Sequence, residues 1–419
     1  MDTMDVKYRE PAAEEFDTRT LLKNAERQAR QRHYEDIHII DVDAHHYENE
    51  SFDQIVPFIE DPIIRHTASA KRGVSGSGSA GGRPTLVNTQ VGFQDVGGRV
   101  TRYHLRRNEK TPPSPHRDVT LTKRYMDAIG IDMLCLFPTP MLNLGLHPNV
   151  EIEVAVARAY NAWLCETILA REPRIVSMLY LPFNDAEATY KMVKDFGHKK
   201  GVAGFMVTSA RYKGVWDNAF MKTYALLEEM NLPLSFHAAY SWDDRLVGNS
   251  NRFITVHALG FTVFNMVNLA NWIVNGLPER FPKLRVMWIE SGLAWVPFMM
   301  QRFDNEYMMR SSECPALKMK PSDYMRQMYF TSQPMEMVGN RTALEETFKM
   351  MNAETQLCYA SDYPHWDMDL PSTIYDLPFL NEQQKRNILG ENGRRFLNVE
   401  PVWSGWKIAA RAAKQAAAQ

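Results

Sequence analysis

Short apolar segments alternate with helical segments over most of this 419-residue chain. Eight segments have the length and the continuous apolar character of buried strands. They are residues 37–43, 131–140, 174–182, 201–209, 232–239, 284–292, 328–332 and the segment that begins at 356. Helical patterns follow seven of them almost directly, whereas a long loop follows the first. Fully apolar strands that alternate with helices are typical of a parallel sheet covered on its faces. Eight such units predict an α/β fold, a (β/α)8 barrel of the TIM type.

The predicted barrel occupies residues 37–400, and three segments lie outside its repeating pattern. Residues 1–36 are mostly polar with helical character, so we expect an N-terminal helical arm that packs on the barrel or on a partner subunit. Residues 60–118 contain "GVSGSGSAGGRP" and "TPPSPHRD", and this density of Gly, Ser and Pro predicts a long inserted loop or lid after the first strand. Residues 401–419 predict a basic, alanine-rich helical tail.

Composition excludes several classes of partner and location. The formal net charge of −2 gives no general attraction for nucleic acid or for an anionic membrane. No uninterrupted apolar span of about 20 residues predicts a transmembrane helix, and the polar N-terminus lacks a signal core. The four cysteines are far apart and form no CxxC pair, which argues against a disulfide framework. We expect a cytoplasmic protein that binds a small molecule. The arm and the apolar helix at 255–275 suggest a homodimer or higher homo-oligomer.

Four of the predicted strands end in acidic or imidazole side chains. Asp43 and His45 follow the first strand, His237 the fifth, Glu290 the sixth and Asp362 the eighth. The C-terminal ends of barrel strands meet at one mouth, where the active sites of such barrels lie. Asp43 and His45 are two residues apart, so they point to the same side of the strand. We therefore expect these remote positions to lie together.

Two imidazoles and two or three carboxylates at one mouth form a nitrogen and oxygen donor set for one divalent metal ion. We expect Zn²⁺, with Fe²⁺ or Mn²⁺ as alternatives, because all three accept such ligands. The predicted ligands are Asp43, His45, His237 and Asp362. Each residue alone also has an ordinary explanation, because a histidine can be a structural hydrogen-bonding group and an aspartate can cap a helix. The coincidence at several strand ends favours the metal site.

Four motifs together resemble the amidohydrolase superfamily. They are "DVDAHHYE", "LPLSFHAA", "ERFPKLRVMWIESGLAWVPFMMQRFD" and "YASDYPHWD", and the likeness runs from about residue 37 to 399. The resemblance is to the amidohydrolase-related branch, which includes aminocarboxymuconate-semialdehyde decarboxylase, resorcylate decarboxylase and related hydrolases. It implies one divalent metal, commonly zinc. By position it implies that Asp43 and His45 are the first two ligands, His237 the ligand on strand 5 and Asp362 the carboxylate on strand 8.

The sequence departs from this family at the end of the sixth strand, where many members place a catalytic histidine. Glu290 stands there, and a carboxylate needs a raised pKa to act as an acid near neutral pH. His257, in "RFITVHALGF", could supply the missing imidazole, although packing among Phe and Leu side chains is the alternative. The predicted catalytic residues are therefore Asp362, together with His257 or Glu290.

Two reactions are compatible with such a site. In hydrolysis, a metal-activated water attacks an amide, ester, lactone or thioester of a small organic acid derivative, and Asp362 accepts the proton. The sequence favours this reaction because the strand-6 histidine is missing. The alternative is non-oxidative decarboxylation of an aromatic or enoic carboxylic acid, in which Asp362 protonates the carbon that loses CO₂. A barrel that only binds a ligand is a third interpretation, and the retained ligand set argues against it.

Residues that closely follow the ligand motifs are candidates for contact with the substrate, because barrel loops carry specificity. Glu48 follows the first motif, Trp242 and Arg245 follow the fifth strand, and His365 and Trp366 follow the eighth. An arginine in such a loop suits a substrate carboxylate or phosphate. A solvated surface arginine is the ordinary alternative.

Overall fold

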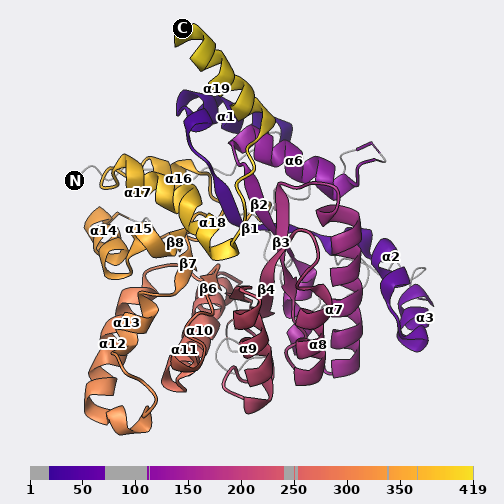
Figure 1. Cartoon of the computed structure of the whole chain (residues 1–419), viewed down its shortest axis with the longest axis vertical. Helices are drawn as coiled ribbons and strands as arrows, with labels where there is room; N and C mark the ends of the chain where they lie inside the picture. Colours follow the sequence, from indigo (N-terminus) through magenta and orange to yellow (C-terminus); the bar gives the residue numbers. More distant parts are fainter. Residues whose placement is uncertain are drawn as a thin grey trace.

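Eight parallel strands form the centre of the molecule. The structure is a computed structural model that describes residues 18–70, 111–112, 114–239, 250, 253–336, 339–365 and 367–418. Each strand pairs with the next, in the order β1 to β8, and helices surround them (Figure 1). The strands are β1 (Ile40–His46), β2 (Met133–Pro138), β3 (Ile175–Tyr180), β4 (Val202–Thr208), β5 (Leu234–His237), β6 (Val286–Ile289), β7 (Tyr329–Thr331) and β8 (Leu357–Cys358). The predicted (β/α)8 barrel is confirmed.

Backbone hydrogen bonds between β1 and the segment after β8 bring the last strand to the first. The Asp362 N–H donates to the carbonyl oxygen of Asp43 at 2.8 Å, and the His45 N–H donates to the carbonyl oxygen of Tyr363 at 2.6 Å. The barrel is therefore nearly closed. This closure places Asp362 beside Asp43, although the two positions lie near opposite ends of the barrel sequence.

Helices cover the outside of the sheet and mostly follow the strands that the sequence predicts. The longer ones are α6 (Arg117–Ile129), α7 (Val150–Leu164), α8 (Ala186–Phe196), α9 (Met221–Glu229), α10 (Phe253–Val274), α12 (Trp295–Arg310) and α14 (Arg341–Met350). The shorter ones are α2 (Phe52–Ile55), α3 (Pro62–Ala70), α11 (Leu277–Arg280), α13 (Pro321–Met325), α15 (Ala353–Gln356), α16 (Ser372–Tyr375), α17 (Glu382–Arg386) and α18 (Asn392–Leu397). Side chains that accept from the first free N–H groups explain several starts. Asn149 caps α7 and Asp185 caps α8 in this way.

The long loop predicted at 60–118 is partly helical. It begins with α3, and α6 already starts at Arg117, while residues 71–110 lie outside the described part of the chain. Near the end of the barrel, a π-helical turn at Asn387–Glu391 separates α17 from α18. Gly390 lies in this turn against the carbonyl oxygen of His38, where a Cβ would collide. Close packing against the chain before β1 thus accompanies the change in helical geometry.

Aromatic packing outside the barrel fixes which side chains point inward. The rings of Phe236 on β5 and Trp288 on β6 stack with centroids 4.6 Å apart, and Trp272 of α10 packs edge-on against Phe236 at 5.7 Å. These residues therefore face the helices. Because side chains alternate along a strand, the next residues, His237 and Ile289, point into the barrel.

The first and last helices lie together at one end of the molecule (Figure 1). They are α1 (Thr18–Gln31) and α19 (Gly405–Ala418). The Lys407 ammonium of α19 donates to Asp132 Oδ2 and to the carbonyl oxygen of Ile37, both at 2.6 Å. The Arg30 guanidinium of α1 lies 3.8 Å from the ring centroid of Trp406. These contacts dock both helices where β1 and β2 begin, at the end opposite the mouth.

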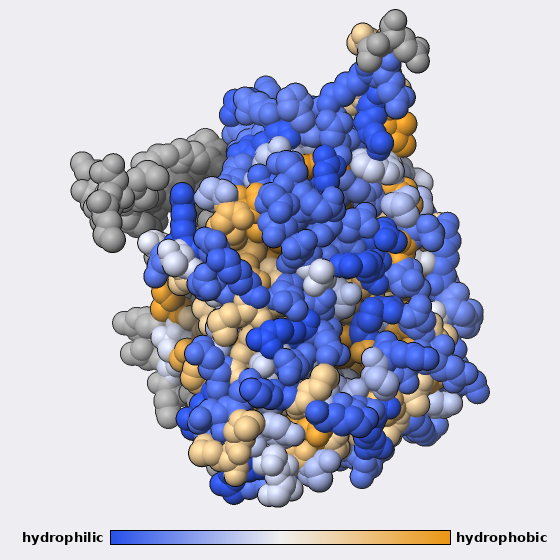
Figure 2. Space-filling model, turned by 60° about the vertical axis from the view of Figure 1, so that its left-hand side comes forward, coloured by the Kyte–Doolittle hydropathy of each residue, from blue (hydrophilic) through white to orange (hydrophobic). Residues whose placement is uncertain are grey.

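Hydrophilic residues predominate on the face drawn in Figure 2, with smaller groups of hydrophobic residues among them. The most apolar long helix, α10, buries Leu269 and Trp272 but leaves Ile254 75% and Val267 52% exposed. Its role in forming an oligomer stays a prediction. In the described part of the chain, no helix combines the length and the apolar character needed to cross a bilayer.

Candidate metal centre

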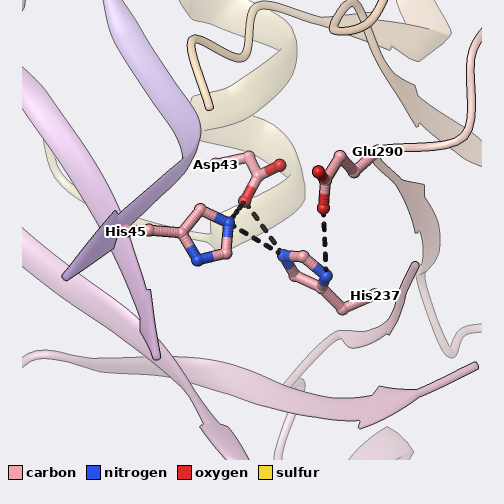
Figure 3. A group of neighbouring side chains, drawn as sticks. All are labelled: Asp43, His45, His237 and Glu290. Atoms are coloured by element: carbon pink, nitrogen blue, oxygen red, sulfur yellow. Dashed lines mark hydrogen bonds and ion pairs between the residues drawn. The ribbon is translucent and has the colours of Figure 1, made fainter. Parts of the chain in front are cut away.

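Asp43, His45, His237 and Glu290 point toward one another at the C-terminal ends of β1, β5 and β6 (Figure 3). The Nε2 atoms of His45 and His237 lie 3.2 Å apart. Asp43 Oδ1 lies 3.4 Å from His45 Nε2 and 3.3 Å from His237 Nε2. All four side chains are buried. Three donor atoms thus converge on one point in the mouth of the barrel.

Backbone carbonyl groups orient both imidazoles. His45 Nδ1 lies 2.8 Å from the carbonyl oxygen of Pro138, and His237 Nδ1 lies 2.9 Å from the carbonyl oxygen of Ala238. A carbonyl oxygen only accepts hydrogen bonds, so each Nδ1 carries the proton. In the neutral ring, each Nε2 then presents a lone pair to the centre. Metal-binding histidines in proteins are held in this way.

Asp362, Glu290 and His365 extend the cluster on one side. Asp362 Oδ1 lies 3.3 Å from His45 Nε2 and 2.7 Å from His365 Nδ1. Glu290 Oε2 lies 3.7 Å from His237 Nδ1, and Glu290 Oε1 lies 4.0 Å from His365 Nδ1. The structure therefore brings together the four residues predicted as ligands, the predicted catalytic Glu290, and His365, which was predicted to contact the substrate.

The backbone at two of these carboxylates is left-handed. Glu290, directly after β6, and Asp362, after β8, both have φ of 57°. Non-glycine residues rarely adopt this conformation, and it persists where surrounding structure imposes it, often at functional sites. The Glu290 N–H is held by Thr331 Oγ1 at 2.9 Å. Both turns redirect a carboxylate that would otherwise continue along the strand.

The electrostatics of the cluster reflect its three buried carboxylates. Burial would raise the pKa of Asp43, but the facing His237 and His45 hold it well below its usual range. Burial would lower the pKa of His45, but Asp362 and Asp43 raise it to about 10. Burial raises the pKa of Glu290 well above its usual range, and the negative charges of Asp362 and Asp43 raise it further. Without a cation, the cluster holds its negative charge only with the help of bound protons.

The chemistry of the donors fits a metal ion. Asp43 Oδ2, Glu290 Oε2 and Asp362 Oδ2 are buried and have no hydrogen-bond partner among the residues that the structure describes. Leaving a buried acceptor unsatisfied is unfavourable by about 1–3 kcal/mol, and more for a charged group. A divalent cation would satisfy several of these atoms at once. Imidazole nitrogens and carboxylate oxygens suit Zn²⁺, Mn²⁺ and Fe²⁺, so the donor set leaves the identity of the ion open.

Glu48 holds the loop that follows β2. Its carboxylate is buried and accepts from the N–H groups of Thr139 at 2.9 Å and Met141 at 2.8 Å. Thr139 Oγ1 in turn lies 3.2 Å from His365 Nε2. Glu48 therefore acts on the centre through the backbone of this loop, and its contact with a substrate stays a prediction.

The other predicted residues lie apart from the donor cluster or outside the described chain. His257, on α10, places Nε2 3.7 Å from Asp367 Oδ2 and belongs to neither group of converging donors. Its catalytic role stays a prediction. Trp242, Arg245 and Trp366 lie outside the residues that the structure describes.

Two members of the site were not assigned to the centre from sequence. His365 was expected to contact substrate, yet its ring stacks on His45 with centroids 4.3 Å apart. The signal was the spacing in "DYPH", which places an imidazole three residues after Asp362. Thr139 was not singled out, although it directly follows β2, at the same end of the barrel as the other site residues.

Three solved structures share this fold at low sequence identity. The 5-carboxyvanillate decarboxylase of Sphingomonas paucimobilis has a TM-score of 0.60 and 18% identity, covering 87% of this chain and 100% of that chain. An amidohydrolase of Mycobacterium avium subsp. paratuberculosis has a TM-score of 0.65 and 19% identity, covering 86% and 99%. The 5-carboxyvanillate decarboxylase of Novosphingobium aromaticivorans, complexed with manganese and 4-hydroxy-3-methoxy-5-nitrobenzoic acid, has a TM-score of 0.60 and 19% identity, covering 87% and 97%.

A comparison with protein families identifies the chain itself. The family model described as amidohydrolase matches residues 83–399. The match includes β2 to β8 and two of the four predicted metal ligands, His237 and Asp362. It spans well over half of the sequence and agrees with the resemblance that the motifs suggest. This chain therefore belongs to the amidohydrolase family of metal-dependent enzymes.

Proposed function

We propose that this protein is a metal-dependent, non-oxidative decarboxylase of an aromatic or enoic carboxylic acid. The observation that carries the proposal is a His and carboxylate donor centre on a fold shared with several decarboxylases of aromatic acids. These include the 5-carboxyvanillate enzymes and the 2,6-dihydroxybenzoate decarboxylase of Rhizobium, which has a TM-score of 0.54. The fold comparisons thus favour the decarboxylase alternative over hydrolysis, the reaction that the sequence alone favoured.

In this proposal Asp43, His45 and His237 hold the metal ion. Their three donor atoms converge within 3.4 Å of one another. When bound, the ion supplies a Lewis acid that orients the substrate carboxylate and a neighbouring oxygen and stabilises developing negative charge. The buried surroundings of these side chains exclude bulk water and strengthen electrostatic interactions.

Loss of CO₂ leaves an electron pair on carbon, and that carbon must then receive a proton. Asp362 and His365 are placed to deliver it, because Asp362 Oδ1 and His365 Nδ1 lie 2.7 Å apart. The Asp362 side chain is fully buried, whereas the His365 side chain is 15% exposed. His365 therefore connects Asp362 to solvent, from which the donated proton is replaced. Thr139 Oγ1 holds the other nitrogen of the ring.

The test uses one panel of substrates that distinguishes decarboxylation from hydrolysis. The metal-loaded protein is incubated with hydroxylated benzoic acids, enoic acids and simple esters, while CO₂ and products are measured by mass spectrometry. We expect CO₂ and the decarboxylated product, with one deuterium on the carbon when the reaction runs in D₂O. Ester cleavage without CO₂ release from any acid would refute the proposal in favour of hydrolysis.

Matched variants distinguish loss of the metal centre from general damage to the fold. Asp43→Asn removes a donor and should abolish CO₂ release, whereas Asp36→Asn changes an exposed aspartate at the opposite end of the barrel and should not. Full CO₂ release by a folded Asp43→Asn variant would show that Asp43 does not hold the required ion.

A further inference from the structure

We propose that Glu336 is a positioning residue, which holds the loop after β6 so that the Glu290 carboxyl faces the metal centre. The inference rests on the proposed function and adds to it a residue outside the donor cluster. Glu336 lies in the loop after β7, and its Oε2 accepts from the N–H groups of Leu293 at 2.9 Å and Ala294 at 3.2 Å. One side chain from a neighbouring loop thus holds the segment that carries Glu290.

The start of α12 uses the Glu336 carboxylate in place of a capping side chain of its own. Ala294 occupies the N-cap position of α12, and an alanine cannot accept a hydrogen bond there. The N–H groups at a helix start need acceptors from elsewhere. Glu336 supplies an oxygen, and its negative charge interacts favourably with the positive end of the helix dipole. The contact therefore has a local physical reason.

Gly292 allows the carboxylate to approach the loop closely. Its φ of 75° is left-handed, and a Cβ at this position would displace the Glu336 carboxylate. The Trp295 indole N–H donates to the carbonyl oxygen of Gly292 at 2.9 Å, so this peptide group is also held in place. Glycine at this position thus fits both the turn and the contact with Glu336.

Two other side chains hold the turn at Glu290 itself. Glu290 has φ of 57°, and its N–H donates to Thr331 Oγ1 of β7 at 2.9 Å. The Thr262 hydroxyl of α10 donates to the carbonyl oxygen of Ser291 at 2.9 Å. A left-handed conformation at a non-glycine residue persists where surrounding contacts impose it. With Glu336, three side chains from three parts of the barrel impose this turn.

The direction of the Glu290 carboxyl depends on this turn. Its Oε2 lies 3.7 Å from His237 Nδ1, and its Oε1 lies 4.0 Å from His365 Nδ1. Both distances are too long for hydrogen bonds, so these contacts do not fix the carboxyl. A displacement of about 1 Å in a catalytic site can lower the rate about 100-fold. Glu336 therefore acts on the reaction through Glu290.

The test measures CO₂ release and amide hydrogen exchange in the full-length protein loaded with Mn²⁺. Glu336→Ala removes both acceptor contacts, so we expect kcat/KM to fall by about 10- to 100-fold and exchange across residues 290–296 to become faster. Glu336→Gln keeps an acceptor oxygen and should retain most of the activity. Glu229→Ala, an exposed change on α9, is the matched control and should follow the wild type. Wild-type activity and exchange in Glu336→Ala would overturn the proposal.

A second variant shows whether Glu336 acts through Glu290. Glu290→Asp shortens the side chain by one methylene group, so its carboxyl no longer reaches the same point. In that background, Glu336→Ala should lower kcat/KM by less than about twofold, because the effects of coupled residues are not additive. A purely structural role of Glu336 would lower kcat/KM by the same factor in both backgrounds, and this result would refute the positioning role.

Failure of the proposed function gives a different result. A wild-type protein that cleaves esters without releasing CO₂ would overturn decarboxylation, and the same variants would then test Glu336 on ester cleavage. Hydrogen exchange tests the contacts of Glu336 without any turnover. Unchanged exchange across residues 290–296 in Glu336→Ala would therefore overturn the positioning role, whichever reaction the protein catalyses.

Discussion

The carboxylate of Asp41 holds Ser361, the residue that precedes Asp362. Asp41 Oδ2 accepts from the Ser361 hydroxyl at 2.5 Å, and Oδ1 accepts from the Ser361 N–H at 2.9 Å. The same Oδ1 accepts from the Asp43 N–H at 3.2 Å. Asp41 is fully buried, and burial raises its pKa to about 8, although the bonds from Ser361 oppose this shift. One side chain thus ties together the two chain segments that carry Asp43 and Asp362.

Replacing Asp41 should weaken metal binding without removing a ligand. In Asp41→Ala the segment that carries Asp362 loses its two hydrogen bonds from Ser361 to β1, and Asp43 loses one within β1. We therefore expect metal affinity to fall by about 10- to 100-fold. Asp41→Asn keeps one acceptor oxygen and should recover part of the loss. Titration of Mn²⁺ into stripped protein measures the effect, with exposed Glu166→Ala as the control. Unchanged affinity in a folded Asp41→Ala variant would mean that Asp41 serves packing alone.

Removing the metal should destabilise the fold. The stripped centre retains three buried carboxylates that face one another, and a ligand present at about 1,000 times its Kd stabilises the folded state by about 4 kcal/mol. We expect the thermal midpoint to fall on chelation and to recover when Mn²⁺ or Zn²⁺ is added back. His237→Asn lacks one donor, so its midpoint should respond far less to metal. An equal response in that variant would place the stabilising ion elsewhere.

Glu153 gives stability a pH dependence that is independent of the metal. It lies buried in the first turn of α7, where Oε2 accepts from Asn184 Nδ2 at 2.9 Å and Oε1 from the Tyr180 hydroxyl at 3.4 Å. Burial raises its pKa from 4.5 to about 7. The folded state then holds the proton more tightly than the unfolded state. The contribution of Glu153 to stability is therefore fully present below pH 4.5 and is lost as pH rises through about 7.

Glu153→Gln should remove this pH dependence. The shift corresponds to about 3 kcal/mol as an upper value, so the variant should gain stability relative to the wild type as pH rises from 4.5 to 7.5. Urea unfolding at several pH values measures the difference. Glu151→Gln, an exposed change in the same turn, should follow the wild type. A constant difference between Glu153→Gln and the wild type across this range would contradict the raised pKa.

The alternation of apolar strands with helices predicted the barrel, and the polar residues that end these strands predicted most of its centre. His237 and Asp362 were assigned because each ends an apolar strand and because strand ends of a parallel barrel meet at one mouth. Asp43 and His45 followed from the alternation of side chains along β1. These inferences depend only on the covalent geometry of a strand and on the order of the elements, and both can be read from sequence.

The rest of the site depends on loop geometry and on long-range hydrogen bonds. His365 turns back onto His45 because Asp362 adopts a left-handed conformation with φ of 57°. The presence of an aspartate at this position in the sequence does not predict that conformation. Glu48 finds its partners in the backbone of the loop after β2, about 90 residues away in sequence. Neither contact follows from a local pattern, because each depends on where a distant segment passes.

The buried ion pair between Lys407 and Asp132 should anchor the C-terminal helix. Both side chains are fully buried, their charged atoms lie 2.6 Å apart, and Asp132 Oδ1 also accepts from the Ser404 N–H at 2.8 Å. Burial lowers the pKa of Lys407 to about 8. Lys407→Met would leave Asp132 buried without its cation, so we expect a loss of about 3–5 kcal/mol in the free energy of unfolding.

The double variant Lys407→Met with Asp132→Asn separates the charge from the packing. It removes both charges, so it should lose less stability than Lys407→Met alone. Lys414, also on α19, is exposed and pairs with Glu35 and Asp36. Because exposed ion pairs contribute little to stability, Lys414→Met should lose much less stability than Lys407→Met. Urea unfolding of the four proteins decides the matter. If the single and double variants lost equal stability, the unpaired carboxylate of Asp132 would not be the cause, and the apolar packing of α19 would have to account for the anchoring.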